Sequence, residues 1–200
     1  MATARLYKTG VASPTNNKIW TISTWIKLHS TTGTIIFAAD GNNDTSWMQV
    51  RFGSDELDIS GYSQGWIKTN SKWRDYNGWY HLVIAADSTQ GTASNRIKCY
   101  VNGEQITSFS TDNRANISQD QTWGWNKASV VHNIGGENAS GYINASYAHF
   151  HNIDGTAYTP SAFGETDSTT GIWKPITSPS VTYGNNGFFL KFDNSANMGL

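Results

Sequence analysis

Residues 79–87, WYHLVIAAD, and residues 96–101, RIKCYV, are the two segments that decide the fold. Side chains alternate between the two faces of an extended strand. In the first segment both faces are partly apolar, with Trp79, His81 and Val83 on one and Leu82 and Ile84 on the other. This pattern indicates a strand in the middle of a sandwich, with a further layer packed outside it. The second segment ends at Asn102-Gly103, a dipeptide typical of a type I′ hairpin turn, because both central positions of that turn need positive φ.

Further period-two runs lie on both sides of this pair, separated by clusters of Gly, Asn, Asp and Ser. They span residues 19–28, 34–40, 46–52, 56–60, 65–69, 103–109, 128–135, 142–153 and 187–193. No long stretch shows helical periodicity, and only TPSAFG (159–164) favours a short helical turn, with Thr159 as its cap. About a dozen short strands predict an all-β antiparallel sandwich or barrel. We expect one domain over residues 18–200, preceded by an N-terminal extension or edge strand at residues 1–17.

The composition excludes several classes of protein. The net charge is −1, from 14 Lys and Arg against 15 Asp and Glu, whereas binding to nucleic acid or an anionic membrane needs a cationic face. Only 14% of residues are charged, and Asn, Ser, Thr and Gly make up about two-fifths of the chain, which disfavours helices. The single cysteine, Cys99, excludes an internal disulfide and is expected to be a buried, inert thiol. No run is apolar and long enough for a secretory signal or a membrane span, so we expect no membrane insertion.

Two blocks of sequence resemble a known family. WTISTWIK (20–27), WYHLV (79–83) and YVNG (100–103) are similar to the laminin-G-like branch of the concanavalin A-like lectin/glucanase superfamily. NIDGTAYTPSAFGETD (152–167), GIWKP (171–175) and YGNNGFFLKFDNS (183–195) resemble a type of this fold found in virion structural and fibre-like proteins of marine tailed bacteriophages. Asn152 departs from the pattern, because an apolar residue is common at that position.

The resemblance implies a two-sheet antiparallel jelly roll and a non-enzymatic role. The protein would be a head decoration, tail or fibre component, made in the host cytoplasm without a signal peptide and placed in the virion. Its partners would be other virion proteins, copies of itself in an oligomer, and host-surface glycans. A soluble calcium-assisted lectin is the alternative from a second class, and a laminarinase-type glycoside hydrolase is the alternative from a third.

Glu56 and Asp58 are the candidate carboxylates of the hydrolase hypothesis. They would share one face of a strand, about 6.6 Å apart. Hydrolases of this fold carry a third acid two residues further on, where this chain has Ser60. Retaining hydrolysis needs one carboxyl protonated and a second ionised. We therefore expect an acidic pair without catalytic function.

Metal ligands are suggested by two other patterns. Asp40, Asn42 and Asp44 form an oxygen-rich loop after an apolar strand, and calcium prefers oxygen ligands. This loop is the predicted calcium site, with an Asx-rich hairpin loop as the alternative, and no other cofactor is expected. His149 and His151 alternate along one strand as two zinc ligands would, but no third ligand accompanies them. We expect them to face solvent or an interface.

Aromatic residues in polar loops form the candidate binding site. Exposed rings can stack on sugars or on a protein partner, and neighbouring polar groups can bind hydroxyls. The candidates for carbohydrate or partner binding are Trp66, Trp73, Tyr76, Trp123, Trp125 and Asn126, with TWGWN (122–126) as the best loop. The alternative is that these rings close the ends of the sandwich.

Overall fold

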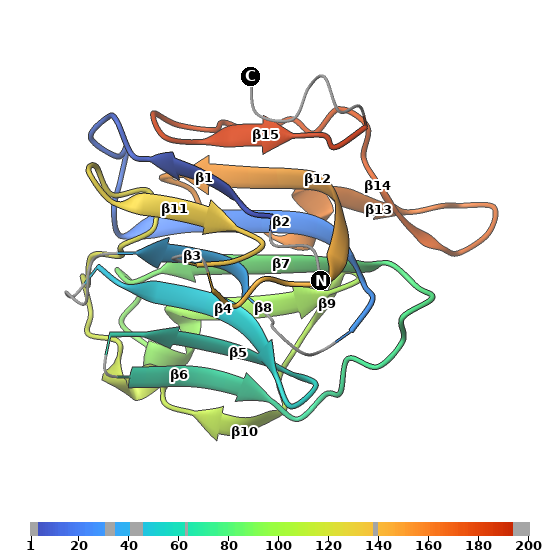
Figure 1. Cartoon of the computed structure of the whole chain (residues 1–200), viewed down its shortest axis with the longest axis horizontal. Coiled ribbons are helices and arrows are strands. Elements are labelled where there is room, and N and C mark those ends of the chain that lie inside the picture. Colours follow the sequence, from blue (N-terminus) through green and yellow to red (C-terminus); the bar gives the residue numbers. More distant parts are fainter. Residues whose placement is uncertain (1–3, 31–34, 41–45, 63, 138–139, 194–200) are drawn as a thin grey trace.

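Two antiparallel β-sheets pack face to face in the computed structural model, and a further layer covers the outside of one sheet (Figure 1). The structure describes residues 4–30, 35–40, 46–62, 64–137 and 140–193. Within these ranges no helix is long and apolar enough to cross a membrane. The predicted all-β sandwich of two antiparallel sheets is confirmed.

One sheet contains seven strands in the described residues. In spatial order they are β1 (Leu6–Thr9), β11 (Val131–Ile134), β3 (Ile35–Asp40), β4 (Met48–Gly53), β5 (Glu56–Gly61), β6 (Gln64–Thr69) and β10 (Phe109–Asp112). The N-terminal strand β1 pairs with β11 and forms one edge of the sheet.

The other sheet contains six described strands and holds the two segments that decide the fold. In spatial order they are β15 (Phe188–Leu190), β12 (Ala145–Asp154), β2 (Ile19–Leu28), β7 (Tyr80–Asp87), β8 (Ile97–Val101) and β9 (Glu104–Gln105). The turn between β8 and β9 has positive φ at both central residues, 49° at Asn102 and 90° at Gly103, as the Asn-Gly dipeptide predicts.

The space between the sheets is filled by large side chains. Trp20 packs edge-to-face against Phe37 and Trp123, with ring centroids 6.3 and 5.8 Å apart. Cys99 is 1% exposed in this core, and burial raises the pKa of its thiol to about 12. The expected buried, inert thiol is therefore what the structure contains.

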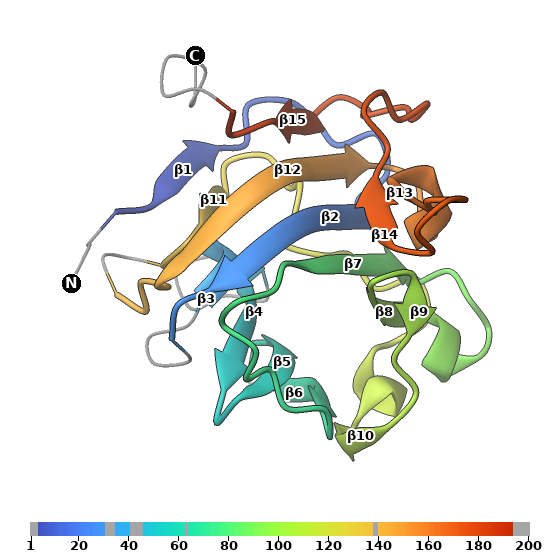
Figure 2. The ribbon, with the colours of Figure 1, turned by 90° about the vertical axis from the view of Figure 1, so that its right-hand side faces the viewer.

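The six-stranded sheet is also covered on its outer face. Residues after β12 turn back across β2 and β7, through the 3₁₀ turn η3 (Pro160–Ala162) and the hairpin β13 (Gly164–Thr166) and β14 (Trp173–Pro175) (Figure 2). We call residues 155–183 the covering layer. A second apolar cluster forms where this layer meets the sheet, with Phe163 contributed by the layer: Val83, Ala85, Tyr100, Ile153 and Phe163. The two apolar faces of residues 79–87 are thus each packed against a layer, as the sequence pattern predicts.

The segment 103–109 differs from the prediction of one continuous strand. β9 ends at Gln105, and the chain then crosses to the other sheet, where β10 begins at Phe109. Ile106, 7% exposed, packs into the core between them, and its N–H donates to the Cys99 carbonyl. There are two further 3₁₀ turns. One is η1 (Ala93–Asn95), in the connection between β7 and β8, and the other is η2 (Arg114–Asn116), which follows β10.

Gly124 provides a test of how the loop 122–126 closes the sandwich. A Cβ at this position would lie 1.5 Å from the Ser46 carbonyl oxygen, so the two segments cannot accommodate a side chain. We expect Gly124→Ala to lower the free energy of unfolding by at least about 2 kcal/mol, measured by urea denaturation. Gly91→Ala is the matched control, because no atom lies within 4 Å of its Cβ position. Equal stability of the two variants would contradict this packing.

Candidate functional site

The predicted exposure of the loop tryptophans is wrong. Trp66, Trp73, Trp123 and Trp125 are between 0% and 5% exposed and belong to the core. Trp123 packs edge-to-face on Trp66, with centroids 5.3 Å apart, and its Nε1 donates to the Lys18 carbonyl at 2.9 Å. Trp66 lies in strand β6, and the loops that carry Trp73, Trp123 and Trp125 fold inward, so that all four rings pack in the core. Buried rings cannot stack on a sugar unless the core opens.

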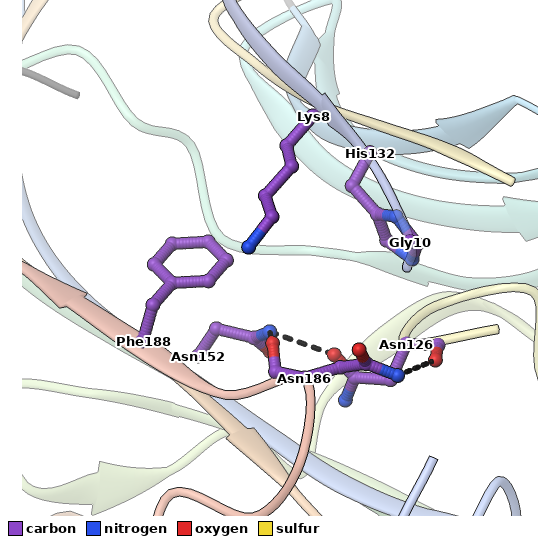
Figure 3. Close-up of a pocket in the computed structure, with 7 residues that line it drawn as sticks. All are labelled: Lys8, Gly10, Asn126, His132, Asn152, Asn186 and Phe188. Carbon is purple, nitrogen blue, oxygen red and sulfur yellow. Dashed lines mark hydrogen bonds between the residues drawn. The ribbon is translucent and has the colours of Figure 1, made fainter. Parts of the chain in front are cut away.

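Asn126 is also buried, at 1% exposed, and forms part of an amide network (Figure 3). Its Oδ1 accepts from Asn152 Nδ2 at 2.7 Å, and Asn152 Oδ1 accepts from Trp125 Nε1 at 2.7 Å. Asn186 Nδ2 donates to the Asn126 carbonyl at 2.8 Å. A cavity of about 20 Å³ beside these amides is large enough only for a water-sized ligand. The network joins three distant segments, which explains why Asn stands at position 152.

Tyr76 is the exposed member of the six candidates, at 39%. It lies in a turn in which Asp75 Oδ1 accepts from the N–H groups of Asn77 and Gly78, at 2.9 and 3.2 Å. Trp79, at the end of the same turn, is 42% exposed. The sequence places Trp79 on a strand face, but β7 begins only at Tyr80, and Trp79 lies in the exposed turn with Tyr76.

Glu56 and Asp58 share a face of β5, as predicted, but both are held in ion pairs. Glu56 Oε2 lies 2.9 Å from Lys68 Nζ, and its Oε1 contacts Lys72 Nζ. Asp58 Oδ2 accepts from Arg51 Nε and Nη2, at 3.1 and 3.0 Å. Hydrogen bonds from Lys72 and Lys68 hold the pKa of Glu56 below its ordinary value. Glu56 is therefore not suited to be the protonated acid of a glycosidase, and Asp58 is engaged by Arg51.

The predicted metal ligands are only partly covered by the structure. Asp40 is the last residue of β3 and is 7% exposed, whereas Asn42 and Asp44 lie outside the described residues. In the described part of the chain, no group of three or more His, Cys, Asp or Glu side chains could hold a metal ion. The calcium loop stays a prediction.

His151, which was expected to face solvent or an interface, is enclosed by the covering layer and β15. It is 2% exposed, stacks on Phe189 with centroids 4.2 Å apart, and its Nδ1 lies 2.9 Å from the Tyr183 hydroxyl. His149 has a φ of 49° at an irregularity in the pairing of β12 with β2, and its ring centroid lies 6.4 Å from that of His151. Burial lowers the pKa of His151 to about 3, so the ring is neutral at pH 7.

His81 joins the covering layer to the sheet. Its ring stacks on Trp25, with centroids 4.9 Å apart, and its Nδ1 accepts from Trp173 Nε1 at 2.9 Å. Since an indole nitrogen only donates, Nδ1 carries no proton, and Nε2–H donates to Ser23 Oγ at 2.8 Å. Burial lowers the pKa of His81 to about 3, which fits this neutral tautomer. The sequence places His81 on the same strand face as Val83, and the structure shows that Trp173 of the covering layer contacts it there.

A groove of about 220 Å³ opens on the outer face of the six-stranded sheet, where the covering layer begins. Its depth arises at Ala85, which carries only a methyl group and lies opposite Thr21 on β2 and Lys98 on β8. The side chains of the groove that can contact a ligand are polar or aromatic: Asp87, Gln90, Asn95, Lys98, Tyr100 and Tyr158. None of them belongs to the loops that the sequence analysis selected.

Both sides of the groove are fixed by hydrogen bonds. Tyr158 N donates to Thr21 Oγ1 at 2.8 Å, and its hydroxyl accepts from Thr182 N at 3.1 Å. On the opposite side, the buried Arg96 guanidinium donates to the Gln90 and Gly91 carbonyls, at 2.9 and 3.0 Å. The arrangement can therefore bind a small polar ligand without first ordering a loop.

The sequence and the fold together define the class of protein. The family profile described as the concanavalin A-like lectin/glucanases superfamily matches residues 5–144. The chain therefore belongs to this superfamily. No curated protein sequence matches the chain significantly.

Solved structures of low sequence identity share the fold. A heptameric pentraxin of the serum amyloid P type from Limulus polyphemus superposes with a TM-score of 0.57 at 15% identity, over 94% of this chain and 88% of that one. Domains LG4-5 of the mouse laminin α1 chain superpose with a TM-score of 0.53 at 9% identity, over 94% of this chain. This chain spans 44% of that laminin chain.

The buried histidines predict an acid-sensitive fold. The ordinary pKa of histidine is 6.5, and the pKa values of folded His81 and His151 are about 3, so the unfolded chain binds protons that the folded chain does not. Their contribution to stability is complete above pH 6.5 and is lost as the pH falls toward 3, at about 1.4 kcal/mol per pH unit for each histidine. We therefore measure the free energy of unfolding by chemical denaturation between pH 6 and 4. Its slope against pH should be shallower in His81→Gln than in the wild type by about this amount.

Gly91→Ala, a substitution at an open surface position without a titratable group, provides the control for this measurement and should keep the wild-type slope. An unchanged slope in His81→Gln would mean that His81 takes up its proton in the folded state.

Proposed function

We propose that the chain is a non-enzymatic interaction module in a structural protein of a bacteriophage particle, as a head decoration, tail or fibre component. The observation that carries the non-enzymatic part is the neutralisation of Glu56 and Asp58 by Lys68, Lys72 and Arg51. Membership of the concanavalin A-like lectin/glucanases superfamily, which contains lectins as well as glucanases, supports a binding role. The placement on a particle rests on the resemblance of residues 152–167, 171–175 and 183–195 to virion proteins.

Such a module acts through surfaces that repeat many times on a particle. Its partners are other virion proteins, copies of itself and host-surface glycans. The pentraxin of similar fold is a heptamer, which supports self-association of a domain with this shape. Many weak contacts displayed together give high avidity, so a shallow site of modest affinity is sufficient.

The first test concerns catalysis. Because Glu56 is ionised and paired, we expect no release of reducing ends from soluble β-1,3-glucan by the purified chain, with an active laminarinase as the positive control. Glu56→Gln should behave as the wild type does. Hydrolysis by the wild type that disappears in Glu56→Gln would establish the hydrolase instead.

The second test concerns location and assembly. Antibodies against the chain should label purified particles in immunogold electron microscopy, and labelling should disappear after pre-absorption with the purified protein. Analytical ultracentrifugation should give a mass that is a multiple of 22.0 kDa. Protein found only in the soluble fraction of infected cells, and absent from purified particles, would contradict the proposal.

A further inference from the structure

The groove above Ala85 is lined by a carboxylate that neighbouring groups hydrogen-bond and by an ammonium group that has no ion pair among the described residues. Asp87 Oδ1 accepts from Thr89 N and Thr89 Oγ1, at 3.0 and 2.6 Å, and its Oδ2 accepts from Gln90 Nε2 at 2.6 Å. Lys98 also lines the groove, but its Nζ forms no ion pair or hydrogen bond with any described residue. The groove therefore presents an uncompensated cation beside a carboxylate whose acceptor capacity is largely used.

The remaining surface of the groove suits a hydroxylated ring. Tyr158 and Tyr100 provide aromatic surface, and Tyr158 is held in place by Thr21, Thr182 and an edge-to-face contact with Phe163 at 6.0 Å. The exposed Asn95 amide contributes both a donor and an acceptor at the rim. A volume of about 220 Å³ lies below the range of about 300–1,000 Å³ typical of drug-sized ligands, so the groove fits a single ring or a chain end.

We propose that this groove binds an anionic saccharide, with one pyranose ring against Tyr158, its hydroxyls on Asn95, and its acidic substituent on Lys98. A neutral sugar would leave the Lys98 ammonium without a partner. A carboxylate or a sulfate ester would supply the same anionic oxygen atoms. The inference deepens the proposed binding role by naming a site and a ligand class, and it does not depend on where in the particle the protein lies.

The test compares three sugars that differ only at position 6: D-glucose, D-glucuronate and D-glucose 6-sulfate. Each is titrated into the full ¹⁵N-labelled chain, and amide shifts are followed by NMR. We expect the two acidic sugars to shift the amides of Ala85, Asn95, Lys98 and Tyr158, and to bind about threefold to fivefold more tightly than glucose, the range of a partly exposed ion pair. The advantage should shrink as salt is added.

Two variants separate the shape of the groove from its charge. Ala85→Leu places a larger side chain at the bottom and should abolish binding of all three sugars. Lys98→Gln should remove the preference for the acidic sugars and keep the weak binding of glucose. Lys27→Gln is the matched control, because Lys27 also lies on the six-stranded sheet without an ion pair among the described residues, away from the groove. Thermal unfolding confirms that each variant is folded.

Three results would overturn the inference. They are shifts that map outside the groove, equal affinity for glucose and the acidic sugars, and unchanged binding in Ala85→Leu. None of these affects particle labelling, so failure of the groove assignment is distinguishable from failure of the proposed function. A preference for glucuronate over the sulfate, or the reverse, identifies which acidic group the site takes.

Discussion

Burial of β2 and β7 on both faces is the constraint on which the rest of the structure depends. Their inward residues form the core between the sheets, and their outward residues include polar groups that lose contact with water under the covering layer. A buried polar group without a partner destabilises the fold by about 1–3 kcal/mol, so the covering layer must supply partners. Trp173 donates to His81, and the backbone of Thr156 and Tyr158 pairs with Thr21. The path of the covering layer follows from these requirements.

Much of this fold is predictable from local patterns, because the alternation of side chains assigns each strand two faces. The alternation in residues 79–87 predicts the covered outer face, and Asn102-Gly103 predicts its turn. Loops follow no such period. Trp123 and Trp125 lie in a short polar loop, which is typical of a surface. In the folded chain their rings instead pack into the core at the end of the sandwich. The one local sign of this was Gly124 between them, which leaves no room for a side chain against Ser46.

The acidic pair shows a different limit of sequence reasoning. That Glu56 and Asp58 share a face follows from their spacing, and the structure agrees. Their function depends on which residues lie opposite, and the register of β4 and β6 is what places Arg51 and Lys68 there. Register between strands is set by the whole sheet, so no spacing within one strand could reveal these cations. For the same reason the groove could not be predicted from the sequence, because its lining comes from β7, β8 and residues beyond β12.

The position of the groove connects binding to the covering layer. One side of the groove is formed by β7, β8 and their connection, within the residues that match the superfamily, and the other side is Tyr158, beyond them. Tyr158 is held by Thr21 from the sheet and by Thr182 from the far end of the layer. Any ligand that contacts both sides binds only while the layer is in place, so it stabilises the attachment of the layer by mass action. Since neutral His81 accepts a hydrogen bond from Trp173 of the same layer, neutral histidine and an occupied groove both favour the attached layer.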